Sequence, residues 1–285
     1  MSSMVTRRGF VGSLVAGAAL YATKTQGAAS RQGASPAPDP NLIADLVAGN
    51  HILVRKGVMQ INGHLSARHP ANPNRFLLSR AIAPEIVQAG DIMEFDLDSN
   101  AIDARGRAAY SERFIHSEIY RARPDVMAVV HAHTPSILPF ATSDIPLRPV
   151  YQQATFIGES VPVYKNGDSG EIVSNAEQAR ELVRVLGGAA VVLMHGHGEV
   201  VVGPSVRTVV SRCIELELNA RILQNILAMG GKPSYLRPTA SDGGRGGGRG
   251  RGAGDGGAQG QGGGRGGFDR DWEAWLQEEK RLMGR

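Results

Sequence analysis

Apolar side chains recur at helical spacing in several stretches of the chain. Between residues 41 and 56, the apolar Leu42, Ile43 and Leu46 fall on one side of a predicted helix. Pro124 ends another such stretch, because proline lacks the N–H group that would continue a helix. Helices are predicted over residues 41–56, 112–123, 175–186, 205–229 and 268–282.

Strand patterns lie between these helices. Residues 91–98 alternate apolar and polar side chains, as a half-buried strand does, whereas 127–133 and 189–194 are continuous apolar runs. Asn62-Gly63 between two short apolar stretches predicts a tight hairpin. Strands are predicted over 58–61, 65–68, 76–78, 91–98, 127–133 and 189–194. Hairpins mixed with intervening helices favour an α/β fold on a mixed or antiparallel sheet.

The first residues follow the order of a sorting signal. The stretch Thr6-Arg7-Arg8-Gly9-Phe10-Val11 fits the twin-arginine pattern, and an apolar run and small residues near Ala28-Ala29 follow it. The run is too short for a stable membrane anchor. We expect residues 1–29 to be a signal peptide read by the twin-arginine export machinery, residues 30–40 a linker, and the mature protein to be periplasmic. The alternative is a chance arginine pair before a buried helix.

The segment 240–267 is mostly glycine with interspersed arginine. It cannot bury enough apolar surface to fold, so we expect a disordered linker. The C-terminal helical segment 268–285 follows, and its Trp272, Trp275 and Leu276 are expected to pack on the core or on a neighbouring subunit. Arg-Gly-Gly repeats can bind RNA, but this segment has few aromatic residues for base stacking. No nucleic-acid partner is therefore expected.

Composition refines this outline only slightly. The formal net charge of the 285 residues is +4, and it falls to +1 without residues 1–29, so charge indicates no particular partner. The remaining core, residues 41–239, has roughly 200 residues and can bury a large apolar core without disulfides. The single cysteine, Cys213, lies in an apolar helical pattern, which favours a buried inert thiol over a catalytic one.

Histidines lie at the end of one predicted buried strand and just after another. His131 and His133 are two positions apart at the end of one strand, so their imidazoles share a face. His197 follows the other strand within His195-Gly196-His197-Gly198. Imidazole suits zinc and other late divalent metals, although a histidine pair can also be an ordinary surface feature. The acidic Glu112 opens a predicted helix upstream.

Several motifs in this order resemble the class II aldolase/adducin family. They are Ser111-Glu112 with His116, Arg123-Pro124-Asp125, Val-Val-His131-Ala-His133, and Leu-Met followed by His197-Gly and Val200-Val201-Val202-Gly203. The resemblance spans about Leu42 to Leu227. It implies a three-layer α/β/α sandwich with a mixed, largely antiparallel sheet. It also implies a homotetramer with sites at subunit interfaces.

The resemblance implies roles for particular residues. His131, His133 and His197 would bind a divalent metal, with zinc expected first and Mn²⁺, Co²⁺ or Fe²⁺ as alternatives. Glu112 would bind the metal at rest and act as general base with substrate. Tyr151 would donate a proton, often to a neighbouring subunit's site, or would be an ordinary packing aromatic. His195 departs from the family pattern and would be an outer group, a competing ligand or a surface residue.

The segments around the substrate differ from those of sugar-phosphate members. Where such members carry Gly-Asn-x-Ser and paired serines, this chain has Gly63-His64-Leu65-Ser66 and Tyr110-Ser111, with Arg80 nearby in sequence. An imidazole and a guanidinium suit a carboxylate. We therefore expect His64, Ser66, Arg80 and Ser111 to bind a small substrate without phosphate, although Arg80 would serve equally as a surface charge.

The resulting hypothesis is a metal-dependent carbon–carbon lyase, a decarboxylase or an aldolase. It would act on a carboxylated hydroxy or keto substrate through a metal-stabilised enolate. The alternatives are a sugar-phosphate aldolase or epimerase and a non-catalytic, adducin-like interaction module. A module need not retain three histidines and a glutamate, so the complete ligand set favours the enzyme.

Overall fold

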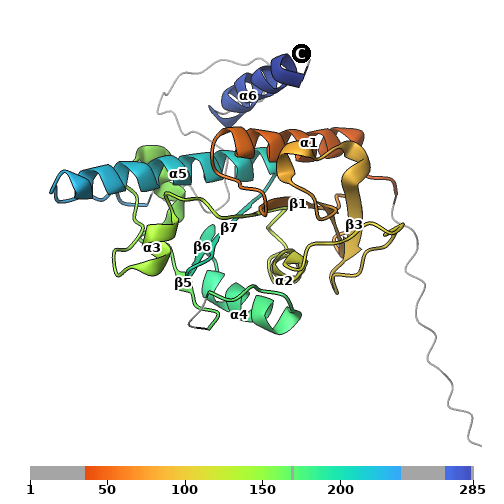
Figure 1. Cartoon of the computed structure of the whole chain (residues 1–285), viewed down its shortest axis with the longest axis horizontal. Coiled ribbons are helices and arrows are strands. Elements are labelled where there is room, and N and C mark those ends of the chain that lie inside the picture. Colours follow the sequence, from red (N-terminus) through yellow and green to blue (C-terminus); the bar gives the residue numbers. More distant parts are fainter. Residues whose placement is uncertain (1–35, 168–169, 239–266, 284–285) are drawn as a thin grey trace, which may run out of the picture. The chain divides into compact units, whose positions relative to one another are not determined.

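Seven strands form one mixed sheet in the part of the chain that the computed structural model describes, residues 36–167, 170–238 and 267–283 (Figure 1). The strand order is β3-β2-β1-β4-β7-β6-β5, with β5 and β6 parallel and the other neighbours antiparallel. The strands are β1 (His64–Arg68), β2 (Arg75–Ser79), β3 (Ile92–Asp96), β4 (Ala128–Ala132), β5 (Val163–Tyr164), β6 (Val191–Met194) and β7 (Gly198–Gly203).

A side-chain hydrogen bond caps the N-terminus of two long helices. The Asp39 carboxylate accepts from the backbone N–H of Asn41 at 2.9 Å where α1 begins, and Ser205 Oγ accepts from the N–H of Thr208 at 3.1 Å where α5 begins. The helices are α1 (Pro40–Arg55), α2 (Arg113–Ala122), α3 (Leu138–Thr142), α4 (Ala176–Leu186), α5 (Val206–Ala228) and α6 (Gly267–Met283), with short 3₁₀ turns η1 (Pro84–Ile86), η2 (Ala89–Asp91) and η3 (Gln152–Ile157).

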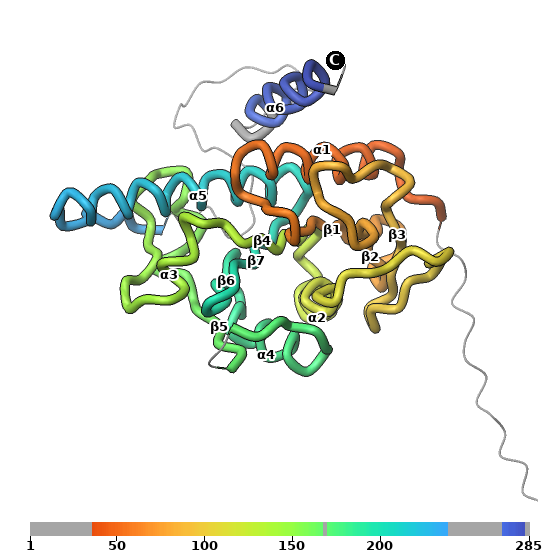
Figure 2. The backbone as a smooth tube through the Cα atoms, viewed as in Figure 1, coloured from red at the N-terminus to blue at the C-terminus, as the bar shows by residue number. Residues whose placement is uncertain are grey.

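Helices cover both faces of the sheet. Figure 1 and Figure 2 show α1 and α5 on one side, the α1/α5 face, and α2 and α4 on the other, the α2/α4 face. Alternate residues of each strand point to opposite faces. In β4, for example, Val130 joins the buried cluster under α1 and α5, whereas Val129 joins the cluster under α2 and α4. The two faces therefore have separate apolar cores.

The predicted hairpin at Asn62-Gly63 is wrong. The N–H groups of Val58 and Met59 both donate to the carbonyl of Leu53, so these residues complete the end of α1 instead of forming a strand. The N–H of Gly63 donates to Gln60 in a turn that leads into β1. Both edges of β1 are already paired, with β2 and with β4, which leaves no edge for a strand over 58–61.

The other predicted elements agree with the structure to within a few residues, and two strands were not predicted. β7 follows directly after the turn from β6, and β5 has only two residues. The predicted signal peptide lies outside the described residues, as do nearly all of the glycine-rich segment 240–267 and most of the linker 30–40. Among the described residues, no helix is both long and apolar enough to cross a membrane.

The C-terminal helix α6 packs on α1 and α5. Trp272 is 1% exposed and belongs to the α1/α5 cluster, and Trp275 and Leu276 pack against that cluster. The Glu279 carboxylate lies 2.7 Å from Nδ1 of His51 and forms an ion pair with Arg55, both on α1. The tryptophans therefore pack on the core of their own chain, one of the two predicted arrangements.

Candidate metal centre

The first ligand candidate, His131, lies in the middle of the sheet. It is fully buried on β4, and the alternation of that strand directs it to the α2/α4 face. Its Nδ1 lies 3.0 Å from the backbone carbonyl of Glu199 on β7. A carbonyl oxygen can only accept, so Nδ1 carries the proton and donates it. This hydrogen bond leaves the lone pair of Nε2 free for a metal, the usual arrangement of a ligating histidine.

His133 and His197 lie on turns beside His131. His133 follows the last residue of β4, and His197 lies in the turn between β6 and β7. Gly196 adopts a φ of 65° in that turn, a conformation that glycine adopts without strain. The ring centroid of His131 lies 4.7 Å from that of His133 and 5.2 Å from that of His197. The three imidazoles therefore form a compact cluster.

Glu112 completes the cluster from the start of α2. It is the residue before the first helical position, and its carboxylate points to the histidines instead of capping the helix. Its Oε1 lies 3.4 Å from Nε2 of His131 and 3.2 Å from Nε2 of His197. The ligand atoms of the four residues all lie within 4.8 Å of one another.

The clustered side chains shift the pKa values of one another. Burial alone would raise the pKa of Glu112, but the adjacent His131 and His197 outweigh burial and hold that pKa well below its usual range. Burial, with the neighbouring imidazoles, lowers the pKa of His133 to about 4. Glu112 is therefore a carboxylate and His133 a neutral imidazole at neutral pH, the forms in which both side chains bind metals.

The arrangement fits a divalent cation. Glu112 Oε1 and His131 Nε2 are buried, and neither makes a hydrogen bond with proper geometry among the described residues. Such orphaned buried atoms are costly unless something else satisfies them. Three imidazole nitrogens and one carboxylate oxygen form a donor set suited to zinc and related metals. The residues present therefore fit the metal that the sequence predicts.

Two of the predicted substrate residues are buried behind this cluster. His64 faces His131 directly across the β1–β4 ladder, and the centroids of the two rings lie 5.1 Å apart. Ser66 is fully buried, and its hydroxyl lies 2.6 Å from Nδ1 of His116 and 2.7 Å from the hydroxyl of Tyr120. Ser66 thus contacts other protein groups instead of opening onto a binding site.

Two other predicted substrate residues lie nearer the surface. The Arg80 guanidinium donates to the Asp91 carboxylate at 2.6 Å, so it already has an anionic partner within the chain. Ser111 is exposed, immediately before Glu112. Sequence analysis predicted substrate roles for both residues, and those roles remain predictions.

Tyr151 and His195 lie outside the cluster of four. Burial and the carboxylates of Glu215 on α5 and Asp271 on α6 raise the pKa of Tyr151, so its phenol lies beside these helices. His195 lies in the same turn as His197 but is not among the four clustered residues. Cys213 is buried, and burial raises its pKa well above the usual range, in keeping with the predicted inert thiol.

Sequence analysis assigned no role to His116 or Tyr120, which contact Ser66. Both lie on α2, and together with Glu112 they are spaced four residues apart, which places all three on one side of the helix. That spacing was the available signal.

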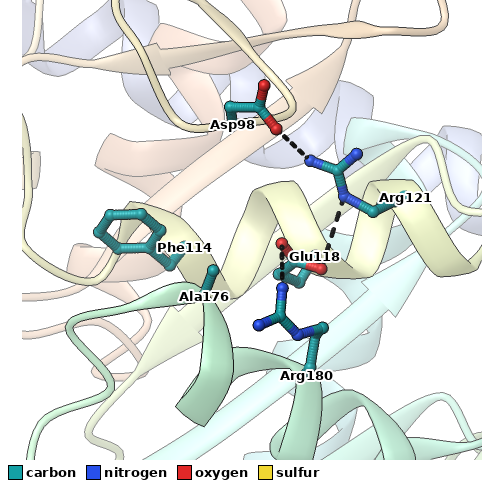
Figure 3. Close-up of a pocket in the computed structure, with 6 residues that line it drawn as sticks. All are labelled: Asp98, Phe114, Glu118, Arg121, Ala176 and Arg180. Atoms are coloured by element: carbon teal, nitrogen blue, oxygen red, sulfur yellow. Dashed lines mark hydrogen bonds and ion pairs between the residues drawn. The ribbon is translucent and has the colours of Figure 1, made fainter.

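A surface pocket of about 400 Å³ lies beside the same helix (Figure 3). Figure 3 shows Glu118 between Arg121 and Arg180, and Arg121 also pairs with Asp98 at 2.7 Å. None of the four clustered residues lines this pocket. The pocket is therefore distinct from the metal centre. Its two acidic and two basic side chains neutralise one another, so it offers no net charge to a ligand.

Curated relatives of this chain include decarboxylases. The chain is 35% identical over 197 residues to decarboxylase tropJ of Talaromyces stipitatus, covering 63% of this chain and 74% of the relative. It is 32% identical over 195 residues to the 3,4-dihydroxyphthalate decarboxylase of Arthrobacter keyseri, covering 63% and 76%. These relatives support a lyase, of the carboxy-lyase or aldolase type.

Solved structures share the fold. An aldolase II superfamily protein from Pseudomonas syringae superimposes with a TM-score of 0.66 at 23% identity, covering 85% of this chain and 93% of that one. An L-fuculose 1-phosphate aldolase superimposes with a TM-score of 0.62 at 19% identity, covering 85% and 97%. At these identities the likeness concerns the fold alone.

A family pattern covers most of the described core. The pattern of the Class II Aldolase and Adducin N-terminal domain matches residues 44–224, a span that includes β1 to β7 and the four clustered residues. This chain belongs to the class II aldolase and adducin family.

Proposed function

We propose that this protein is a divalent-metal-dependent decarboxylase of a small hydroxylated aromatic or keto acid. The observation that carries the proposal is the convergence of Glu112, His131, His133 and His197, whose ligand atoms lie within 4.8 Å of one another. The relatives named as decarboxylases, one of them acting on 3,4-dihydroxyphthalate, support the carboxylated substrate. An aldolase of a non-phosphorylated substrate is the second form of the same lyase chemistry.

Two contacts favour this substrate over a sugar phosphate. A phosphate cradle needs free hydroxyl and cationic groups, but the Ser66 hydroxyl is held between His116 and Tyr120. The Arg80 guanidinium is paired with Asp91. Both groups would have to abandon buried or charged partners to bind phosphate, and that cost disfavours a phosphorylated substrate.

The groups at the metal centre have different proposed roles. His131, His133, His197 and Glu112 would hold the metal, which supplies a positive charge that stabilises negative charge developing on a substrate oxygen. The Glu199 carbonyl keeps His131 in the tautomer that a ligand needs. Glu112 remains ionised because of its histidine neighbours, so it is available to accept a proton when substrate arrives.

We further propose that Tyr151 acts as a proton donor in a homotetramer. Its phenol lies beside Glu215 and Asp271 of its own chain, and it is not part of the cluster of four. Donation across a subunit boundary would reconcile that position with a catalytic role. The helices on both sheet faces support describing each subunit as a three-layer α/β/α sandwich.

We also propose zinc as the native metal and export to the periplasm by the twin-arginine route. The imidazole-rich donor set supports zinc, with Mn²⁺, Co²⁺ and Fe²⁺ as the alternatives. The arginine pair and the apolar run in residues 1–29 support export. Elemental analysis of the exported, mature protein tests both proposals together.

The decisive experiment measures CO₂ and aldehyde release by the metal-loaded protein. The substrate panel contains 3,4-dihydroxyphthalate, other dihydroxybenzoates and keto acids, and a matched sample treated with a chelator is the control. We expect CO₂ release that stops on chelation and returns with metal. Aldehyde without CO₂ would make the protein an aldolase. A fully loaded protein that releases neither product would favour the non-catalytic, adducin-like module.

A further inference from the structure

Four buried polar side chains form one hydrogen-bonded network behind the metal centre. Nδ1 of His64 lies 2.7 Å from Nε2 of His116, whose Nδ1 lies 2.6 Å from the hydroxyl of Ser66. That hydroxyl lies 2.7 Å from the hydroxyl of Tyr120. All four residues are at most 1% exposed. We call His64, His116, Ser66 and Tyr120 the buried polar network.

One atom of the network has no partner among the described residues. The Nε2 atom of His64 is buried and makes no hydrogen bond there. The His64 ring lies beside His131, with centroids 5.1 Å apart, and beside Tyr110, with centroids 4.6 Å apart. A buried polar atom without a partner is costly, and its position next to the metal centre indicates that a ligand supplies the missing partner.

The other end of the network sets the direction of its hydrogen bonds. Burial raises the pKa of Tyr120 well above its usual range, so its hydroxyl keeps its proton, and Ser66 Oγ is the side-chain acceptor within reach. Ser66 then directs its own proton to Nδ1 of His116. A neutral His116 consequently carries its proton on Nε2 and donates it to Nδ1 of His64.

The same logic assigns the last proton of the network. His64 accepts at Nδ1, so as a neutral imidazole it carries its proton on Nε2, the unpartnered atom. No carboxylate is hydrogen-bonded to either histidine among the described residues, and full burial favours their neutral forms. The free atom is therefore an N–H donor rather than a lone pair.

We propose that the buried polar network holds His64 as an Nε2–H donor that binds an anionic oxygen of the substrate, a carboxylate or a phenolate, beside the metal. His116, Ser66 and Tyr120 are positioning residues, because they act on substrate only through His64. The anionic character of the substrate rests on the proposed function. The direction of the network does not, since it follows from the distances and the donor inventory.

The ¹⁵N NMR spectrum of the zinc-loaded, histidine-labelled protein tests the direction. We expect His64, assigned from the peak missing in His64→Gln, to carry its proton on Nε2. Tyr120→Phe keeps the ring but removes the first donor, so His64 should then populate both tautomers. Tyr164→Phe removes another buried hydroxyl and should leave His64 unchanged. A wild-type His64 protonated on Nδ1, or a spectrum unaffected by Tyr120→Phe, would overturn the proposal.

Binding of two probes identifies the acceptor. A shift of the His64 Nε2–H resonance with both 2,3-dihydroxybenzoate and catechol supports a phenolate, and a shift with the acid alone supports a carboxylate. No shift with either probe overturns the proposal. Tyr120→Phe and Ser66→Ala should each weaken binding of the shifting probe about tenfold at unchanged metal content. These measurements need no turnover, so absent CO₂ release would refute only the proposed function.

Discussion

The two faces of the sheet use the same strands for different purposes. On β1, Leu65 and Ala67 point into the apolar cluster under α1 and α5, whereas His64 and Ser66 point to the α2/α4 face. On β4, Val130 and His131 divide in the same way. Every buried polar group near the metal centre on these strands thus has an apolar neighbour in sequence on the opposite face.

This division shows how the fold tolerates an expensive site. Buried imidazoles and a carboxylate cost free energy unless they are bonded or bind a metal. The α1/α5 face compensates, because it buries a continuous apolar cluster that α6 extends with Trp272. We therefore expect substitutions at the metal centre on the α2/α4 face to change mainly the affinity for metal. Substitutions on the α1/α5 face should change mainly the free energy of unfolding.

The largest effect should come from adjacent residues of β4 that face opposite ways. His131→Ala removes a ligand and should weaken metal binding more than about 100-fold, beyond the usual loss for outer groups. Val130→Ala should keep the metal but lower the free energy of unfolding by about 2 kcal/mol. Elemental analysis and denaturant unfolding measure the two. Metal loss in Val130→Ala at intact fold would contradict the separation.

The second effect tests the α1/α5 face alone. Trp272→Ala removes a side chain that is 1% exposed and should lower the free energy of unfolding by about 3 kcal/mol, with metal content unchanged. Trp275→Ala, at a half-buried position of the same helix, is the matched control and should cost less. Equal losses in the two variants would mean that α6 does not dock through Trp272.

A third prediction concerns Gly198, the first residue of β7, which lies beside Ala132 and His133. A Cβ atom on Gly198 would lie 2.1 Å from the carbonyl oxygen of Ala132 and 2.9 Å from Cδ2 of His133. Gly198→Ala should therefore force β7 away from β4, cost about 1–3 kcal/mol, and weaken metal binding as well. Gly188→Ala meets no atom within 4 Å and should change neither quantity.

Most helices and strands were predictable from the sequence because their apolar periodicity is clear and residues such as proline mark their ends. The helix over 112–123 ended as expected before Pro124, and the apolar run over 127–133 became β4. The hairpin at Asn62-Gly63 failed because turn residues report local geometry only. Whether a strand has a free edge depends on distant partners, here β2 and β4, which local sequence does not reveal.

The cluster of four candidate ligands was predictable for a similar reason, since each residue lies near the end of a buried strand, follows one, or opens a helix. The network behind them was not predicted, because its contacts join β1 to α2 across 50 or more residues. Ser66 illustrates the difference. Its place in a motif suggested a substrate contact, whereas the fold surrounds it with His116 and Tyr120.

The last prediction concerns the pH dependence of stability, and it again distinguishes the two faces of the sheet. Burial lowers the pKa of His116 to about 3, whereas an unfolded histidine titrates near 6.5. Between these values the unfolded chain binds one more proton at this residue, so His116 alone lowers the stability of the metal-free protein by up to about 1.4 kcal/mol per pH unit as pH falls below about 6.5. His116→Gln should reduce the slope of stability against pH in denaturant unfolding across pH 4–8. Trp272→Ala, on the apolar face, should shift the curve downward without changing its slope. Parallel curves for His116→Gln and wild type would show that His116 makes no such proton-linked contribution.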